Sequence, residues 1–232
     1  MKFNAKPIST PYIEAIFEVV MTNIQPMQTA QYANAIALLR KGKCVVLPTE
    51  TVYGLAARAD NALAVSMIYD IKERTRDLPL SICVFSSAQA AQICHVSPLA
   101  QALMDAFWPG PLTLVLPQKE TANIAINVNE GLGSLGLRCP DIEWREGFLA
   151  LGFDTPLALS SANISGDPSP KTANEAAESL QEDSLLILDG GIGASGQDST
   201  VISVEDNRAK ILRTGPIDAK DFRAFNIEWD VS

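Results

Sequence analysis

The segment CVVLPTETVYGL, residues 44–55, decides the fold class, because a short apolar run passes directly into a group of polar residues. Residues 44–47 have the length and composition of a buried strand, which Pro48 ends. Two hydroxyls, a carboxylate and a phenol then follow, at the kind of strand end where α/β proteins place ligand groups. The segment therefore predicts an α/β fold and a candidate site. A turn held by side chain-to-backbone hydrogen bonds is the open alternative for the polar residues.

The elements expected on either side alternate between helix and strand. Helices are predicted over Thr29–Arg40 and Asn61–Lys72, from Ser97, and from the capping box Thr172–Glu175. Short apolar runs predict strands over Leu80–Phe85, Leu112–Leu116, Leu135–Arg138, Leu157–Ser160 and Leu185–Leu188. A hairpin over Val201–Val204 and Lys210–Leu212 and a short helix over Asp218–Phe225 complete the set. This order predicts one α/β domain with a mixed sheet over residues 27–232, preceded by an N-terminal extension or edge element over residues 1–26.

Composition narrows the function classes. The 232 residues are 47% hydrophobic and 19% charged, which predicts a folded domain with a substantial core. The formal net charge of −9 argues against a surface that binds nucleic acid or anionic membranes. Four widely spaced cysteines and one histidine give no metal-binding spacing, so we expect reduced cysteines and a cytoplasmic location. Glu14 and Glu18 interrupt the apolar N-terminal stretch, so no signal peptide or membrane span is expected.

Two further segments carry cations. Lys72, Arg74 and Arg76 follow the second predicted helix and could surround a triphosphate, although cations at a helix C-terminus also complement the helix dipole. Arg138 ends a predicted strand that begins near Ser134, and its planar guanidinium could hold a carboxylate. A solvated charge at the rim is the open alternative for Arg138.

Two polar loops complete the candidate site. Residues 160–166, SSANISG, offer hydroxyl and amide groups that suit phosphate or ribose oxygens, although a capped loop would use the same residues. Residues 190–200 contain glycines that allow close approach of a ligand, and Arg213 follows at the end of the last predicted strand. The sequence lacks a P-loop and a G-x-G-x-x-G motif, and His95 is its only histidine. These residues favour neutralisation and positioning of a phosphoryl centre over nucleophilic catalysis by the protein.

Taken together, the polar segments resemble the YrdC-like family of L-threonylcarbamoyladenylate synthases over roughly residues 28–216. The matching motifs, in the order of that family, are PTETVYGL (48–55), IKxR (71–74) with PL (79–80), WPGPLT (108–113), LRCP (137–140), SANxSG (161–166), STVI (199–202) and LRxG (212–215). A single motif of this kind is weak, whereas seven in the right order are specific.

The resemblance implies a twisted open sheet with flanking helices around a concave cavity. It also implies a nucleotidyltransferase that makes threonylcarbamoyl-AMP and pyrophosphate from L-threonine, bicarbonate or CO2, and ATP, with Mg2+ accompanying ATP. Downstream proteins would transfer the threonylcarbamoyl group to tRNA, and the acidic composition predicts little direct affinity for tRNA. By position, the residues implied for threonine are Thr49, Ser134, Arg138 and Thr200. Those implied for ATP are Lys72, Arg74, Ser161, Asn163, Ser169 and Arg213, with Lys72 and Arg74 as the catalytic cations.

The sequence departs from the family pattern at several positions. Thr75 stands where proline is frequent, Cys83 where some relatives have a histidine near threonine, and Asp198 where glutamate is usual. Longer relatives carry a second domain after the LRxG segment, and the chain ends soon after Arg213, so we expect the product to leave freely or pass to separate proteins. Two alternatives stay open: a paralogue that hydrolyses threonylcarbamoyl-AMP or handles another carbamoyl-adenylate, and a module that binds structured RNA.

Overall fold

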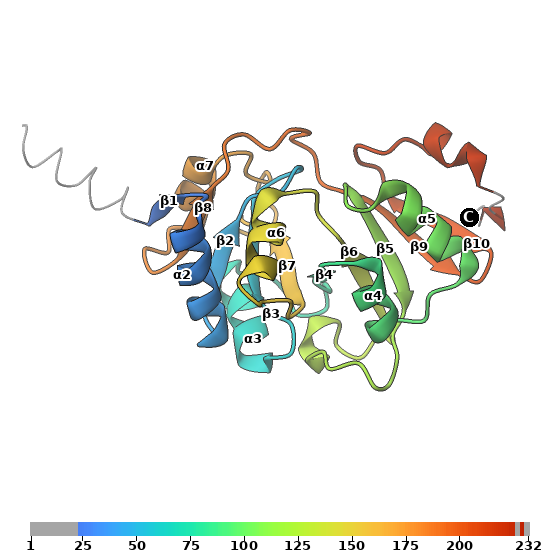
Figure 1. Cartoon of the computed structure of the whole chain (residues 1–232), viewed down its shortest axis with the longest axis horizontal. Helices are drawn as coiled ribbons and strands as arrows, with labels where there is room; N and C mark the ends of the chain where they lie inside the picture. Colours follow the sequence, from blue (N-terminus) through green and yellow to red (C-terminus); the bar gives the residue numbers. More distant parts are fainter. Residues whose placement is uncertain (1–22, 226–227, 230–232) are drawn as a thin grey trace, which may run out of the picture.

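The computed structural model describes residues 23–225 and 228–229, which form one mixed α/β sheet with helices packed against it (Figure 1). The strands are β1 (Ile24–Pro26), β2 (Val45–Leu47), β3 (Gly54–Arg58), β4 (Ser81–Cys83), β5 (Leu112–Pro117), β6 (Ser134–Arg138), β7 (Leu157–Ser161), β8 (Leu186–Asp189), β9 (Thr200–Glu205), β10 (Arg208–Arg213) and β11 (Glu228–Trp229). The helices are α2 (Thr29–Arg40), α3 (Ala62–Ile71), α4 (Ser87–Ile93), α5 (Pro98–Phe107), α6 (Glu143–Ala150) and α7 (Ala173–Leu180), with 3-10 turns η1 (Ile126–Val128) and η2 (Ala219–Ala224).

The strands of the described residues run in the order β1-β8-β2-β3-β7-β4-β6-β5-β9-β10-β11. The sheet contains parallel pairs, such as β8 with β2, β4 with β6 and β5 with β9, and antiparallel pairs, such as β2 with β3, β3 with β7 and β5 with β6. The prediction of a single mixed, open sheet is confirmed. This order brings β3, β7, β4, β6, β5 and β9 together as consecutive neighbours, although they are far apart in the sequence.

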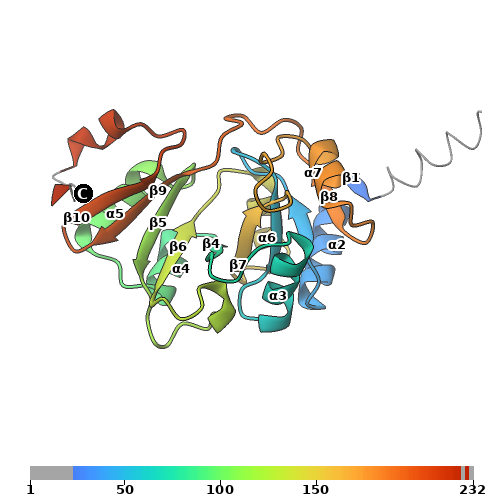
Figure 2. The ribbon, with the colours of Figure 1, turned by 180° about the vertical axis from the view of Figure 1, so that it is seen from behind.

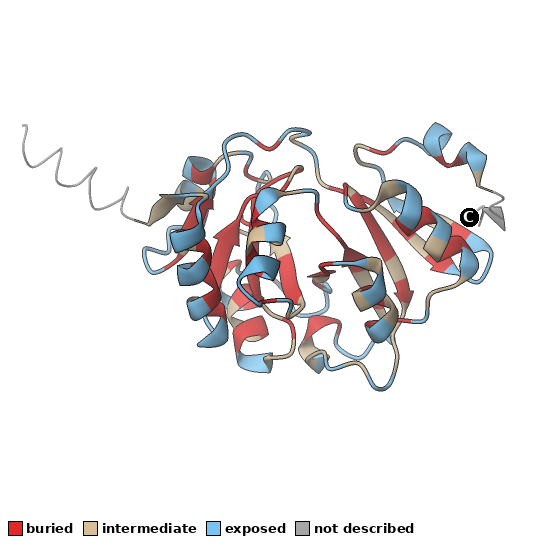
Figure 3. Ribbon diagram, in the orientation of Figure 1, coloured by how far each residue is buried: buried red, intermediate tan, exposed pale blue. Residues whose placement is uncertain are grey.

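Alternation of side chains along the strands divides the core into two clusters. In β2, Val46 packs with the cluster that contains residues of α3 and α7, whereas Val45 and Leu47 pack with the cluster that contains residues of α2 and α6. Figures 1 and 2 show these two pairs of helices on opposite sides of β2 and β3. Buried residues are concentrated in the strands, and exposed residues on the outer helix surfaces (Figure 3). A sheet covered on both sides explains why its central strands are almost continuously apolar.

Several predicted helices begin and end where the sequence indicated. Helix α2 has the predicted bounds, Thr29–Arg40. Asn61 caps α3 by accepting hydrogen bonds from the backbone N–H groups of Leu63 and Ala64, and Ser97 caps α5 in the same way through Ala100. The segment predicted as a short helix over Asp218–Phe225 is the 3-10 turn η2 instead.

Helix α6 was not predicted, and it supports the polar segment that follows β2. Its Trp144 is fully buried and donates a hydrogen bond from Nε1 to the carbonyl oxygen of Pro48 at 2.7 Å. A Cβ atom at Gly147 would come within 2.4 Å of the Tyr32 ring, so only glycine permits this approach of α6 to α2. Pro48 directly precedes the polar residues that follow β2, so this hydrogen bond from α6 helps to fix their position.

The last residues of the predicted N-terminal segment, 24–26, form β1, which pairs with β8 at the edge of the sheet. Residues 1–22 lie outside the described residues. No helix among the described residues is both long enough and apolar enough to span a bilayer.

Candidate functional site

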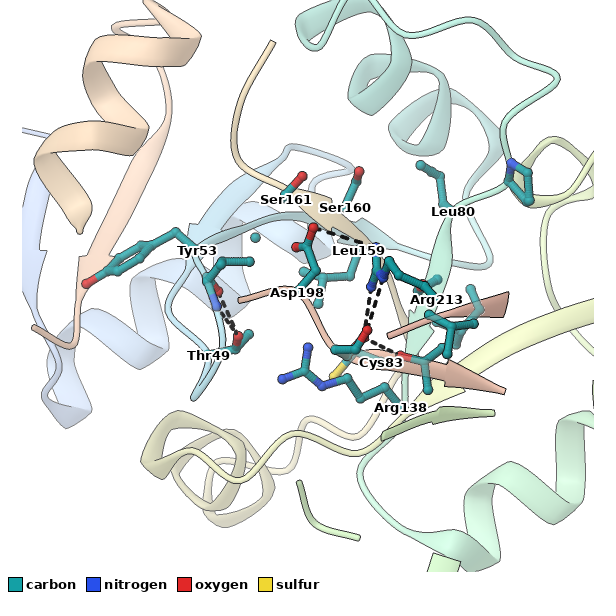
Figure 4. Close-up of a pocket in the computed structure, with 18 of the residues that line it drawn as sticks. Thr49, Tyr53, Leu80, Cys83, Arg138, Leu159, Ser160, Ser161, Asp198 and Arg213 are labelled. Atoms are coloured by element: carbon teal, nitrogen blue, oxygen red, sulfur yellow. Dashed lines mark hydrogen bonds and ion pairs between the residues drawn. The ribbon is translucent and has the colours of Figure 1, made fainter. Parts of the chain in front are cut away.

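A cavity of roughly 790 Å³, part of it open to solvent, lies where the central strands end (Figure 4). Many of its lining residues come from the five polar segments that the sequence singled out, with further residues from β4, β5, β7 and β9. The polar and charged residues that line it are Thr49, Tyr53, Arg74, Ser81, Thr113, Arg138, Ser160, Ser161, Asp198, Ser199 and Arg213.

Arg138 occupies one end of the cavity, at the last residue of β6. It is 7% exposed, and its Nε donates a hydrogen bond to the carbonyl oxygen of Gly110 at 3.3 Å. Its Nη2 lies 2.8 Å from Oε1 of Glu50, a carboxylate whose two oxygens are buried and accept no hydrogen bond of good geometry. The contact is therefore a buried ion pair that fixes the guanidinium. The prediction that Arg138 is a solvated rim charge is wrong, because the side chain is buried.

Thr49 lies beside Arg138 in the cavity wall, but its hydroxyl is used by the turn. Oγ1 accepts hydrogen bonds from the backbone N–H groups of Thr51 and Val52 at 3.2 Å each, and donates to the carbonyl oxygen of Val52 at 2.7 Å. The same oxygen lies 2.7 Å from the hydroxyl of Thr51. The alternative predicted for this segment, a turn held by side chain-to-backbone hydrogen bonds, is what the structure contains, and this turn forms part of the cavity wall.

Two arginines lie at the other side of the cavity. Arg74 is held by hydrogen bonds to the carbonyl oxygens of Leu78 and Pro79, both at 3.2 Å, and its burial lowers its pKa from the usual value. Arg213 is about half exposed, and it donates hydrogen bonds to the carbonyl oxygen and hydroxyl of Ser199 at 3.0 and 3.1 Å. Backbone carbonyls thus orient both guanidinium groups.

Asp198 lies next to Arg213, with Oδ2 3.6 Å from Nη1 of the arginine. Ser169 donates a hydrogen bond to this carboxylate at 3.2 Å, and Ser199 exchanges one with Thr113 at 2.7 Å. Asp198 is the one carboxylate among the described residues that line the cavity. The side of the cavity opposite Arg138 thus combines two guanidinium groups, one carboxylate and several hydroxyls.

Lys72 is not among the residues that line the cavity. It is 1% exposed, and its ammonium donates hydrogen bonds to the carbonyl oxygens of Ser161 and Asn163 and to Oδ1 of Asn163. Burial lowers the pKa of Lys72 to about 8, an effect to which the positive charge of Arg74 adds and which the carboxylate of Asp198 opposes. Asn163, itself buried, is bound between Lys72 and its own loop.

Three other residues implied by the resemblance, or noted with them, lie away from the cavity. Ser134 is at the opposite end of β6 from Arg138 and lines a separate groove with residues of β5 and β10. Thr200 is buried, and its hydroxyl exchanges hydrogen bonds with the backbone of Ile217. Arg76 pairs with Asp70 on the surface and lies over the ring of Tyr69. The structure therefore brings together Thr49 and Arg138 with Arg74, Ser161 and Arg213, but not Ser134 or Thr200.

Some residues that line the cavity were not predicted as site residues, although the sequence contained a signal for them. In a strand, neighbouring side chains point to opposite faces. Because Thr200 points away from the cavity, Ser199 and Val201 on either side of it line the wall. Thr113, within the WPGPLT motif, reaches the cavity from β5 in the same way. Glu50 lies in the quoted segment, but its pairing with Arg138 joins residues far apart in the chain and had no local signal.

An α/β sheet with such a cavity, in which one guanidinium can hold a carboxylate and two others can face phosphates, defines a protein that binds small anionic ligands. A family model named Sua5_yciO_yrdC, described as "Telomere recombination", matches residues 37–215. The chain belongs to this family.

The comparisons also gave close individual matches. A threonylcarbamoyl-AMP synthase of Bacillus subtilis is 41% identical over 84% of this chain and 56% of its own length, and one of Pyrococcus abyssi is 41% identical over 78% and 53%. The chain thus spans about half the length of these relatives. The structure of P. abyssi Sua5 complexed with L-threonine superposes with a TM-score of 0.81 at 35% identity, covering 89% of this chain and 61% of that one.

Proposed function

We propose that this chain forms threonylcarbamoyl-AMP and pyrophosphate from L-threonine, bicarbonate or CO2, and ATP. The observation that carries the proposal is the cavity that Arg138, Arg74 and Arg213 line together with several hydroxyl groups. Relatives named for this synthase activity and a relative whose structure contains L-threonine support it. The cavity offers a place for a carboxylate at one side and for phosphates at the other.

L-Threonine is proposed to bind at the Arg138 side. The guanidinium is fixed through Nε by Gly110 and through Nη2 by Glu50, so its remaining N–H groups are oriented before the substrate arrives. A substrate carboxylate would accept charge-assisted hydrogen bonds from them, each stronger than a neutral one. Thr49 contributes through the rigid turn that it stabilises, and buried Cys83 and Leu159 supply apolar wall nearby.

ATP is proposed to bind at the side of Arg74, Arg213 and Ser161. The threonine amine adds to CO2, giving a carbamate and releasing a proton. A carbamate oxygen then forms a bond to the α-phosphorus of ATP while the bond to the bridging oxygen breaks, and pyrophosphate leaves. Because no protein nucleophile takes part, the protein contributes positioning and the stabilisation of charge on the phosphates, which Arg74 and Arg213 supply.

Mg2+ is proposed to enter with ATP. No cluster of three or more His, Cys, Asp or Glu side chains that could hold a metal exists among the described residues, so a dedicated protein cage is not the expected arrangement. Mg2+ in enzymes of this chemistry is held by one or two carboxylates together with substrate phosphates, and Asp198 is the carboxylate at the cavity. The ion would supply further neutralisation of phosphate charge when bound.

The product is proposed to pass to separate proteins that transfer the threonylcarbamoyl group to tRNA. The net charge of −9 gives a polyanionic tRNA little attraction outside the cavity. The alternative of a structured-RNA module predicts tRNA binding that weakens strongly with salt and needs no catalysis. A gel-shift titration at two salt concentrations distinguishes the two.

The decisive experiment follows pyrophosphate release from ATP by the purified chain. Release is expected only when L-threonine and bicarbonate are both present, and threonylcarbamoyl-AMP should accumulate in step with it. If ATP is consumed without threonine, the proposal is wrong. If the chain instead converts added threonylcarbamoyl-AMP to AMP in the absence of pyrophosphate, it is the hydrolytic paralogue.

A further inference from the structure

The α3–β4 loop, residues 73–79, carries Arg74 to the cavity, and none of these described residues is buried. Its leucine, Leu78, is 43% exposed. Glu73, at the start of the loop, has a φ of 49°, in the left-handed region that residues other than glycine adopt at a cost. Because the loop has no apolar anchor, polar contacts must hold its shape. The residues that make those contacts therefore decide where Arg74 points.

Tyr69 of α3 binds the far end of the α3–β4 loop. Its side chain is buried, and its hydroxyl lies 3.2 Å from the carbonyl oxygen of Leu78 and 3.3 Å from that of Val128 in η1. The same Leu78 carbonyl accepts a hydrogen bond from Nε of Arg74 at 3.2 Å. Burial raises the pKa of Tyr69, so the hydroxyl keeps its proton and stays a donor. Tyr69 and Arg74 are thus joined through one carbonyl oxygen, which has a lone pair for each.

Arg76 binds the middle of the loop to the surface of α3. Its Nη1 donates a hydrogen bond to the hydroxyl of Ser66 at 3.1 Å, and its Nη2 donates one to Oδ1 of Asp70 at 3.0 Å. Its Cζ lies 5.5 Å from the centre of the Tyr69 ring, within the range of a cation–π contact. Ser66 and Asp70 stand one turn apart on the same face of α3, so the planar guanidinium can reach both. The loop cannot move away from the helix without breaking these three contacts.

We propose that Arg76 and Tyr69 are positioning residues: together they fix the α3–β4 loop so that the guanidinium of Arg74 faces the phosphates of the nucleotide. This inference rests on the proposed function for the identity of the nucleotide. Neither Arg76 nor Tyr69 lines the cavity, so both act through the loop. Arg74 is bound through Nε and Nη2 to the carbonyl oxygens of Leu78 and Pro79, so a shift of that segment turns the whole guanidinium.

The first experiment tests the loop without any nucleotide. Amide hydrogen exchange is compared between the wild type and Arg76→Ala, whose removed side chain is 45% exposed, so the fold should survive. The amide of Leu78 donates a hydrogen bond to the carbonyl oxygen of Thr75 within the loop. We expect it to exchange at least about fivefold faster in the variant, with the amides of β5 unchanged. Equal exchange in the two proteins would overturn the role of Arg76, whatever the ligand is.

The second experiment measures the Kd of ATP and of L-threonine by calorimetry. Arg76→Ala and Tyr69→Phe should each weaken ATP by about 3- to 10-fold, the scale of an exposed ion pair with a cation–π contact or of one hydroxyl hydrogen bond. The Kd of threonine should change by less than about twofold, because Arg74 and Arg138 lie on different sides of the cavity. Equal weakening of both ligands would indicate a general loss of structure and would overturn the positioning role.

Two further variants sharpen this comparison. Lysine keeps a positive charge near the Tyr69 ring and Asp70, so Arg76→Lys should recover most of the affinity for ATP, and no recovery would contradict the contacts described. Arg40→Ala is the matched control, because Arg40 lies 5.9 Å from the Phe153 ring and neither residue lines the cavity. It should change neither Kd, and a loss of ATP affinity equal to that of Arg76→Ala would remove the case for the loop.

The third experiment repeats Arg76→Ala in the Arg74→Ala background. If Arg76 acts through Arg74, its removal changes the Kd of ATP by less than about twofold once Arg74 is absent. The same 3- to 10-fold loss in both backgrounds would show that Arg76 acts on the nucleotide by itself, and the inference would be wrong. An unaltered Kd in Arg74→Ala alone would also refute it, whereas failure of the wild type to bind ATP would refute the proposed function.

Discussion

Replacement of the buried ion pair of Glu50 and Arg138 offers a test that separates stability from substrate binding. The two charged atoms lie 2.8 Å apart, and the side chains are 16% and 8% exposed. Arg138→Met alone would leave both buried oxygens of Glu50 without a countercharge, which costs about 3–5 kcal/mol in comparable buried pairs. The double variant with Glu50→Met removes both charges and should regain most of that stability, because apolar replacement of a buried pair is often neutral.

Binding of L-threonine should respond in a different way. Loss of the charge-assisted contact to the substrate carboxylate is expected to weaken threonine by about 1.5–3 kcal/mol, or roughly 10- to 150-fold, in the single and the double variant alike. The Kd of ATP should change by less than about threefold, because Arg138 lies at the other end of the cavity from Arg74 and Arg213. Urea unfolding measures the stability, and calorimetric titration of each substrate measures the binding.

Three results would refute this reasoning. If the double variant binds threonine as the wild type does, Arg138 does not hold the substrate carboxylate. If the single variant is as stable as the double one, the ion pair does not carry the energy that its burial implies. A shift in ATP affinity with threonine unaffected would mean that the two ligands are placed the wrong way round.

Three other changes probe the remaining parts of the site. Arg74→Ala should lower kcat/KM for ATP by about 10- to 150-fold with the Kd of threonine unchanged, and wild-type kinetics would exclude its phosphate role. Thr200→Val should lower the free energy of unfolding by about 1 kcal/mol, because the hydrogen bond to Ile217 is lost, and should leave threonine binding unchanged. Weaker threonine binding in a folded variant would contradict the placement of the Thr200 hydroxyl away from the cavity. Without Mg2+, the Asp198→Asn variant should bind ATP more tightly than the wild type, and adding Mg2+ should raise its affinity for ATP by less. An equal rise in affinity in the two proteins would exclude Asp198 as a contact of the metal.

The pH dependence of stability follows from Lys72. Its pKa is about 8 in the folded protein and near 10.5 when unfolded, so between these values the unfolded chain binds a proton that the folded chain does not. Stability should therefore rise with pH over this window, by up to about 3 kcal/mol relative to Lys72→Met. Urea unfolding of both proteins across the window measures the difference, and parallel curves would show that the pKa is not lowered.

Local patterns in the sequence predicted those elements whose ends are marked by residues close to them in the chain. The caps Asn61, Ser97 and Thr172 lie within three residues of the N–H groups that they bind, and so the starts of α3, α5 and α7 could be read directly. Helix α6 was missed because its sequence EWREGFLA is only 8 residues long and contains Gly147. Its position depends on the contact of that glycine with Tyr32, more than 100 residues away, which no local pattern encodes.

The candidate site also divides into features that local patterns predict and features that they do not. The motifs predicted which segments meet, because strand ends of one sheet share an edge. They did not predict which side chains of a segment face the cavity: Thr200 was chosen, whereas its neighbour Ser199 lines the wall. Lys72 is the clearest case, since a cation beside a phosphate site suggests a direct contact, and only the three oxygens around it show that its donors are occupied.

The distribution of charge explains how an acidic protein can hold a polyanion. Of the three arginines at the cavity, Arg138 is paired with Glu50 and Arg213 lies near Asp198, whereas Arg74 is held by backbone carbonyls. Carbonyl dipoles orient a guanidinium but leave its full charge to the ligand, so Arg74 should contribute more to phosphate binding than the half-exposed Arg213, whose charge is screened by water and by Asp198. Burial of Arg74 strengthens this effect, since a charge that is poorly solvated gains more from a phosphate. The net charge of −9 thus describes the surface, and the field inside the cavity is set by a few oriented cations.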